Sequence, residues 1–189
     1  LRRPPRTPLF PYTTLFRSPD GSRIATGGWD HSVRLWNAAT GAALAPPLEG
    51  HTAWIAALAW SPDGSRIVSA SADRDLRQWI AATGQPASPP LTGHRNWVLA
   101  ATWSPDGRQI VSGSADGSLR RWDTASGNPV GEAMYGHRPW VSAVAYSPDG
   151  RHIASAGWDR KLRLWQADNG VPIGPALEEI GRASCRERV

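Results

Sequence analysis

Cysteine, methionine, phenylalanine and lysine are all scarce in this chain. Its 189 residues include one Cys, one Met, 2 Phe and one Lys, against 20 Arg and 11 Trp. The single cysteine, Cys185, supplies neither a disulfide framework nor a cysteine-based zinc site. One cysteine also does not indicate whether the protein belongs to an oxidising or a reducing compartment. The most apolar stretch, residues 53–60, is far shorter than the roughly 20 residues of a membrane-spanning helix. These shortages argue against a disulfide scaffold, a zinc domain and a helical membrane protein.

The positive charge is concentrated at one end of the chain. The formal net charge is +5, which suggests nucleic acid or anionic lipid as a partner. Four arginines and no acidic residue lie in residues 1–18, so the central part of the chain is close to neutral. Net charge therefore does not indicate a basic binding surface, and nucleic-acid binding ranks below the readings that follow.

A repeat of 43 residues organises the sequence. Ser-Pro-Asp-Gly occurs at 18–21, 61–64, 104–107 and 147–150, and Gly-His occurs at 50–51, 93–94 and 136–137. An aspartate and a tryptophan recur with the same step, at Asp30, Asp73, Asp116 and Asp159 and at Trp36, Trp79, Trp122 and Trp165. No insertion or deletion separates these positions, so the repeats are structural copies of one another.

Each repeat predicts four short β-strands. In the second repeat, residues 54–60 are apolar on both faces, as in a strand that is covered on both sides. Ser-Pro-Asp-Gly predicts a tight turn, because proline fixes φ and glycine accepts a positive φ. Strands are then expected at residues 66–71 and 76–79, and a proline-containing edge strand ends near Leu91. Such units predict the blades of a β-propeller.

On these motifs the sequence resembles the WD40-repeat family over residues 18–177. The matching features are Gly-His, Ser-Pro-Asp-Gly, the repeated aspartate and the strand-ending tryptophan, although only Trp122-Asp123 keeps the Trp-Asp pair. The resemblance implies an all-β, partial WD40-type propeller of four consecutive four-stranded antiparallel blades, the first of them incomplete. The expected boundaries are 18–49 for incomplete blade 1, then 50–92, 93–135 and 136–178 for repeats 2, 3 and 4.

The two ends, residues 1–17 and 179–189, are expected to be a non-native flank and a non-native tail. Residues 180–189 can be encoded by DNA whose reverse complement encodes residues 9–17. That DNA looks like a sequencing-library adapter read in opposite senses at the two ends of an insert. The position 43 residues before His51 is Pro8, so the first repeat lacks its Gly-His.

The recurrent His, Ser, Asp and Trp invite two interpretations. A Ser–His–Asp set is the constellation of a catalytic triad. Alternatively, a buried indole N–H needs an acceptor, and a hydroxyl and an imidazole can link it to a carboxylate. Recurrence in every full repeat favours this hydrogen-bond network, which the family resemblance also implies. Its members are His51, Ser69, Asp73, Trp79, His94, Ser112, Asp116, Trp122, His137, Ser155, Asp159 and Trp165.

Other repeated positions suggest contacts. Trp29 and Trp158 directly precede the repeated aspartate, in a turn that the resemblance places on the partner-binding face, so either partner contact or packing is open for them. Trp54, Trp97 and Trp140 begin the inner strands, where packing is favoured. Gln78 and Arg121 stand where the other repeats have leucine, and the sequence suggests no role for them.

The resulting hypothesis is a non-enzymatic protein–protein interaction scaffold, a fragment of a larger WD40 propeller protein, with no catalytic residue, cofactor or metal. The alternatives are part of a multidomain enzyme or signalling protein whose catalytic domain lies elsewhere, and nucleic-acid binding. Unknown protein partners are expected and a membrane is not. Because an open arc leaves blade faces exposed, missing blades or a second copy are expected to close the ring.

Overall fold

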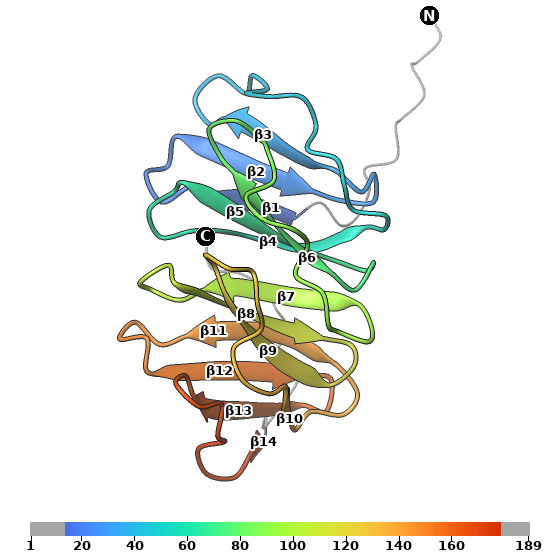
Figure 1. Ribbon diagram of the computed structural model, residues 1–189, viewed down its shortest axis with the longest axis vertical. Helices are drawn as coiled ribbons and strands as arrows, with labels where there is room; N and C mark the ends of the chain where they lie inside the picture. The colour runs from blue at the N-terminus through green and yellow to red at the C-terminus, as the bar shows by residue number, and fades with distance from the viewer. Residues whose placement is uncertain (1–13, 179–189) are drawn as a thin grey trace, which may run out of the picture.

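A computed structural model describes residues 14–178, which form 14 β-strands and no helix (Figure 1). The strands group into four antiparallel sheets in chain order. The first two sheets contain β1 (Thr14–Arg17), β2 (Arg23–Gly27), β3 (Val33–Asn37), β4 (Ile55–Trp60), β5 (Arg66–Ser71) and β6 (Leu76–Ile80). The last two contain β7 (Val98–Trp103), β8 (Gln109–Ser114), β9 (Ser118–Asp123), β10 (Met134–Tyr135), β11 (Val141–Tyr146), β12 (His152–Gly157), β13 (Lys161–Gln166) and β14 (Leu177–Glu178).

Each sheet is one blade of a partial β-propeller. Within a sheet every strand pairs with the next strand along the chain, and the first strands β1, β4, β7 and β11 lie against one another in succession. Figure 1 shows the four sheets following one another from the blue N-terminal end to the red C-terminal end. The all-β WD40-type fold predicted from the repeat is thus confirmed.

The Ser-Pro-Asp-Gly turns have the same local chemistry in every blade. In blade 2 the Ser61 hydroxyl donates to Asp63 Oδ1 at 2.6 Å, and the same carboxylate oxygen accepts the Ser65 N–H at 3.0 Å. Gly64 follows with a φ of 68°, a conformation that costs glycine little. The turn therefore connects the first two strands of the blade without strain.

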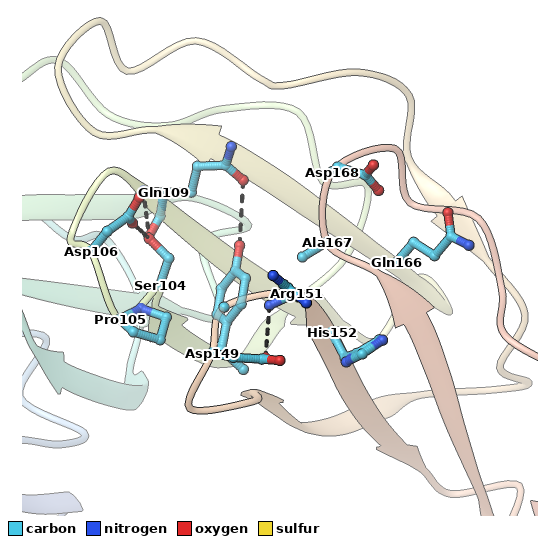
Figure 2. Close-up of a pocket in the computed structure, with 12 residues that line it drawn as sticks. Ser104, Pro105, Asp106, Gln109, Asp149, Arg151, His152, Gln166, Ala167 and Asp168 are labelled. Carbon is cyan, nitrogen blue, oxygen red and sulfur yellow. Dashed lines mark hydrogen bonds between the residues drawn. The ribbon is translucent and has the colours of Figure 1, made fainter.

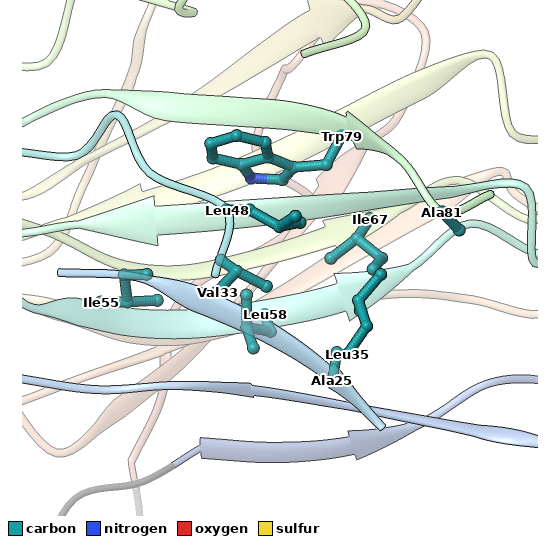
Figure 3. Packing of buried hydrophobic residues seen from close by; sticks show 9 residues of the cluster. All are labelled: Ala25, Val33, Leu35, Leu48, Ile55, Leu58, Ile67, Trp79 and Ala81. Carbon is teal, nitrogen blue, oxygen red and sulfur yellow. The ribbon is translucent and has the colours of Figure 1, made fainter. Parts of the chain in front are cut away.

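The hydrophobic core lies between neighbouring blades. Val33 and Leu35 of blade 1 are buried in the same cluster as Ile67 and Trp79 of blade 2 (Figure 3). Equivalent clusters join blade 2 to blade 3 and blade 3 to blade 4. Each blade is consequently stabilised by its neighbours, as in other repeat architectures.

The first and fourth strands differ in detail from expectation. Residues 1–17 were expected to lie outside the blades, but Thr14–Arg17 forms β1 and pairs with β2 in the register that β4 adopts with β5. In blades 1 and 2 the fourth segment makes only isolated bridges, such as Leu76 to Leu91, and no regular strand. Consecutive prolines precede the bridging leucine in these two blades, and proline lacks the N–H that a ladder needs.

Candidate functional site

The sequence-selected residues of blade 2 form one hydrogen-bonded chain. His51, in the loop that enters the blade, faces Asp73 Oδ2 through Nδ1 and Ser69 Oγ through Nε2, each at 2.7 Å. The indole N–H of Trp79 donates to Ser69 Oγ at 2.8 Å. Because a carboxylate only accepts, the Nδ1 that faces Asp73 bears the proton, and Nε2 of a neutral imidazole accepts the serine O–H. The chain thus connects the entering loop to β5, β6 and the turn between them.

Blades 3 and 4 repeat this chain with nearly the same geometry. The His Nδ1–Asp distances are 3.1 and 2.9 Å, and the His Nε2–Ser and Trp Nε1–Ser distances lie between 2.8 and 2.9 Å. All three histidine side chains are fully buried. The residues concerned are His94, Ser112, Asp116 and Trp122 in blade 3, and His137, Ser155, Asp159 and Trp165 in blade 4.

Blade 1 retains only part of the hydrogen-bonded chain found in the other blades. Trp36 donates its indole N–H to Thr26 Oγ1 at 2.8 Å, which replaces the serine of the other blades. Asp30 pairs with the Arg34 guanidinium at 2.9 Å and accepts the Ser32 hydroxyl at 3.0 Å. None of the described histidines, including the adjacent His31, forms a hydrogen bond with the Asp30 carboxylate.

In each complete hydrogen-bonded chain of blades 2, 3 and 4, the carboxylate, the imidazole and the hydroxyl follow one another as in a hydrolytic catalytic triad. The serine hydroxyl, however, is inaccessible to a substrate. Ser69 and Ser112 have no exposed surface, and each hydroxyl oxygen already accepts an indole N–H. A nucleophile must reach its substrate, so these hydroxyls are unsuited to acyl transfer.

The aspartates of the three hydrogen-bonded chains, in blades 2, 3 and 4, are held in the ionised form. Burial by itself would raise the pKa of Asp73, but hydrogen bonds from His51 and from the Thr52 N–H lower it to about 2. The pKa of Asp116 and that of Asp159 are also lowered against burial, chiefly by the facing histidine. Each carboxylate therefore acts as a permanent acceptor at neutral pH.

We expect acid to weaken the fold through these carboxylates. A lowered pKa in the folded chain means that the ionised form stabilises the fold above the ordinary value of 3.8, and that this contribution is lost as the pH falls towards 2. Urea unfolding measured from neutral pH to pH 2 should show the free energy of unfolding falling below pH 4. Unfolding that is independent of pH across this interval would contradict the assignment.

Five tryptophans form a continuous row across all four blades. Trp29 stacks on Trp54 with ring centroids 5.7 Å apart, and the Trp54 ring meets Trp97 edge-on at 5.8 Å. The row continues from Trp97 to Trp140 at 6.0 Å and from Trp140 to Trp158 at 4.6 Å. Trp29, Trp97 and Trp158 are 53%, 41% and 64% exposed. We call these five residues the tryptophan row.

Two kinds of local structure supply the row. Its ends, Trp29 and Trp158, lie in the turns between the second and third strands of blades 1 and 4. The three central rings directly precede the first strands β4, β7 and β11. Sequence reasoning selected both groups but did not bring them together, because the row exists only once neighbouring blades are side by side.

Gln78 and Arg121 have a role that sequence reasoning missed. Gln78 Nε2 donates to the backbone carbonyl of Thr124 in the next blade at 3.4 Å. Arg121 Nη1 donates to the backbone carbonyls of Ala167 and Asp168, each at 2.7 Å. Both side chains are buried, so they are polar links between consecutive blades.

Arginines on the second strands make comparable links between blades 1 and 2 and, beside Gln78, between blades 2 and 3. Arg23 Nη1 donates to the Ala81 carbonyl at 3.2 Å, and Arg66 Nη1 donates to the Thr124 carbonyl at 3.1 Å. Blade 3 has the shorter Gln109 at this position, and Arg121 supplies the guanidinium there instead.

A polar cavity of about 660 Å³ lies beside Gln109, between blades 3 and 4 (Figure 2). Tyr146 donates its hydroxyl to Gln109 Oε1 at 3.4 Å, and burial raises its pKa to about 12. Hydrogen bonds from the Ser104 hydroxyl and the Arg108 N–H lower the pKa of Asp106, and equivalent bonds lower that of Asp149. Both carboxylates therefore stabilise the Ser-Pro-Asp-Gly turns to which they belong. A similar cavity of about 500 Å³ lies between blades 2 and 3.

The described part of the chain shows no cluster of three or more His, Cys, Asp or Glu side chains suited to a metal ion. It also has no helix with the length and apolar character that crossing a membrane requires.

The comparisons with known proteins agree with the geometry. The family described as "WD domain, G-beta repeat" matches residues 13–37, 44–79, 87–123 and 127–166. No curated protein matches the chain. Each match covers the first three strands of one blade, and the last three matches begin in the fourth segment of the preceding blade. Together they cover most of the chain, and we conclude that the chain belongs to the WD40-repeat family.

Proposed function

We propose that this chain is a non-enzymatic interaction module that binds a protein partner across the tryptophan row. WD40 repeats generally build protein-interaction scaffolds, and the chain has four of them. The observation that supports this site is the unbroken contact of five rings over four blades, with three rings well exposed. Tryptophan is one of the residue types enriched among the residues that contribute most binding energy at protein interfaces.

The position of the rings favours binding without large rearrangement. Each central ring adjoins a first strand whose opening residue, Ile55, Val98 or Val141, is buried. Neighbouring rings also restrict one another, so little side-chain entropy is lost when a partner covers them. The contiguous rings form an apolar strip, which favours an apolar protein surface as the partner.

The proposal predicts that the two end rings are required for binding. Peptides selected from a random-sequence phage library on the immobilised chain should lose at least about tenfold in affinity when Trp29 and Trp158 are both replaced by alanine, because exposed aromatic anchors are typical hot spots. Tyr135→Ala is the matched control, since this ring is 62% exposed but lies on the edge strand β10. Selected peptides that bind both variants like the unaltered chain would refute the site.

We further propose that the His–Ser–Asp–Trp chains are structural. They recur in three blades, their hydroxyls are inaccessible, and each one joins an entering loop to the strands of its blade. A structural network is expected to recur in every repeat that has the same fold. A catalytic site, in contrast, is normally found at one location in a protein, so recurrence in three blades supports the structural role.

We also propose that the chain is part of a larger propeller. In it, a further blade covers the face of blade 4 that is turned away from blade 3, and this blade comes from missing repeats or from a second copy. Leu162, Leu164 and Leu177 are exposed there. The equivalent apolar positions in blade 1, Val33, Leu35 and Leu48, are buried by blade 2.

A further inference from the structure

Positive charge is concentrated at one end of the tryptophan row. Three exposed arginines lie two residues from a ring of the row in blades 3 and 4: Arg95 before Trp97, Arg138 before Trp140 and Arg160 after Trp158. None of these guanidinium groups forms a hydrogen bond or an ion pair with a side chain in the part of the chain that the structure describes. We call these three residues the rim arginines.

Backbone hydrogen bonds fix two of the rim arginines beside the row. The Arg95 N–H donates to Asp116 Oδ2 at 2.8 Å, which joins the entering loop of blade 3 to its β8–β9 turn. The Arg138 N–H donates to Asp159 Oδ2 at 3.4 Å in the same arrangement in blade 4. Both aspartate side chains are only 12% exposed, so the guanidinium groups are the charges that face solvent at this end of the row.

The blade 1 and blade 2 end of the row contains acidic groups beside its arginines. Asp30 is half exposed and pairs with the Arg34 guanidinium at 2.9 Å. In the β5–β6 turn Arg74 lies between Asp73 and Asp75. Burial and the Asp73 charge raise the pKa of Asp75, and the Arg74 charge acts against this shift. Uncompensated positive charge is therefore found over blades 3 and 4.

We propose that the partner of the tryptophan row is a protein segment whose carboxylates bind Arg95, Arg138 and Arg160 while its apolar residues cover the rings. Guanidinium groups bind carboxylates through paired N–H donors, and complementary charge fixes the register of a partner. The acidic part of the segment lies over blades 3 and 4, and the apolar part extends towards Trp29. This inference rests on the proposed function, because it specifies the chemistry of the partner at the same site.

The backbone of Arg160 supplies an independent argument. Its φ is 59°, in the left-handed region that disfavours residues with a Cβ, and blade 3 has Gly117 at this repeat position with a φ of 83°. Arg74 and His31 occupy the same position in blades 2 and 1 with φ of 80° and 64°. A long polar side chain is thus kept at this turn at a cost that glycine avoids. Such strained residues cluster at functional sites, which supports a binding role for the guanidinium.

The test uses peptides selected from a random-sequence phage library that lose affinity when Trp29 and Trp158 are both replaced by alanine. Asp and Glu should be enriched at one end of these peptides relative to the library. Replacing these acids by Asn and Gln should weaken binding at least about tenfold, since hydrogen bonds between charged groups are lost. Raising the salt from about 50 mM to about 500 mM should weaken the acidic peptides but not their amide analogues, because salt screens exposed charges.

Matched double substitutions locate the charges that bind the peptides. Arg95→Gln combined with Arg138→Gln should weaken the selected peptides about tenfold, because two charge-assisted contacts are lost. Arg108→Gln combined with Arg151→Gln removes the same charge from exposed positions in the Ser-Pro-Asp-Gly turns, at the opposite ends of the strands. This control should bind the peptides like the unaltered chain.

A single substitution separates binding from folding. Arg160→Gly should weaken the acidic peptides, while the urea midpoint of unfolding should not fall, because glycine accepts the positive φ of this position. A lower midpoint, or unchanged binding, would contradict the role given to Arg160.

The outcomes distinguish this inference from the proposed function. Peptides that depend on Trp29 and Trp158, but show no acidic preference and bind the Arg95 and Arg138 double variant normally, would overturn this inference and leave the proposed function standing. Selected peptides that do not depend on the two tryptophans would refute the proposed function and this inference with it. Single-stranded oligothymidylate that binds as tightly as the peptides, and is lost in the same double variant, would assign the rim arginines to nucleic acid and overturn the acidic protein segment.

Discussion

Replacing His94 with alanine is expected to lower the free energy of unfolding by about 1–3 kcal/mol, the range for leaving a buried polar partner unpaired. The change would leave the Asp116 carboxylate and the buried Ser112 hydroxyl without the imidazole that lies 3.1 and 2.8 Å from them. Asp116→Ala should have an effect of similar size, because it removes the acceptor that faces Nδ1. Urea unfolding monitored by circular dichroism measures both variants.

The first blade offers the matched control for this prediction. Asp30 occupies the same repeat position but is half exposed and pairs with Arg34 in place of a histidine. Exposed ion pairs are worth roughly 0–1 kcal/mol, so Asp30→Ala should cost clearly less than Asp116→Ala. Equal losses in the two blades, or unchanged unfolding in all three variants, would show that the imidazole bridge does not stabilise the fold.

The network was predictable because the resemblance to the WD40-repeat family implies it, and because the repeat period narrows the choice of the hydroxyl. Once Trp79, Trp122 and Trp165 recur at a constant step, any group that contacts them must recur with the same step. Of the positions two and four residues before the aspartate, only the latter, Ser69 and its equivalents, carries a hydroxyl in every repeat, and the structure places this hydroxyl 2.8 to 2.9 Å from each indole nitrogen. Local sequence and global architecture point to the same bonds.

Contacts between blades were less predictable, for two physical reasons. Gln78 and Arg121 donate to backbone carbonyls. Because every residue has a backbone carbonyl, the sequence does not show which residue provides the acceptor. The tryptophan row depends on how far each blade is rotated from the next, a quantity that no turn or strand motif specifies. For Trp29 and Trp158 the sequence therefore left partner contact and packing open, and it did not identify them as the ends of one surface.

The strand boundaries show where local preference and pairing diverge. β1 forms in a segment expected to lie outside the blade, because the free edge of β2 accepts Thr14–Arg17 in the same register that β5 offers β4. A sheet edge can pair with a segment whatever its origin, since the bonds involve only the backbone. The family match at residues 13–37 likewise extends over this strand.

We expect the isolated chain to self-associate through blade 4, and the double substitution Leu162→Lys and Leu164→Lys to abolish this association. The two side chains are 38% and 36% exposed, whereas the equivalent Val33 and Leu35 are buried by the next blade. Burying a fully exposed leucine contributes roughly 1.5–3 kcal/mol, and these two side chains retain about a third of their exposure, so each contributes a fraction of that value and several together favour contact with another blade. Lysines at these positions would place charges in that contact, which is costly without partners.

Sedimentation velocity over a range of protein concentrations distinguishes the two states. Leu44→Lys is the control, because Leu44 is 46% exposed but lies on the outer edge of blade 1, away from this face. The unaltered chain and the Leu44 variant should both form larger species as the concentration rises, while the double variant stays at the mass of one chain. A clean monomer for the unaltered chain, with cooperative unfolding, would contradict the requirement for a covering blade, since each repeat buries its core only against its neighbours.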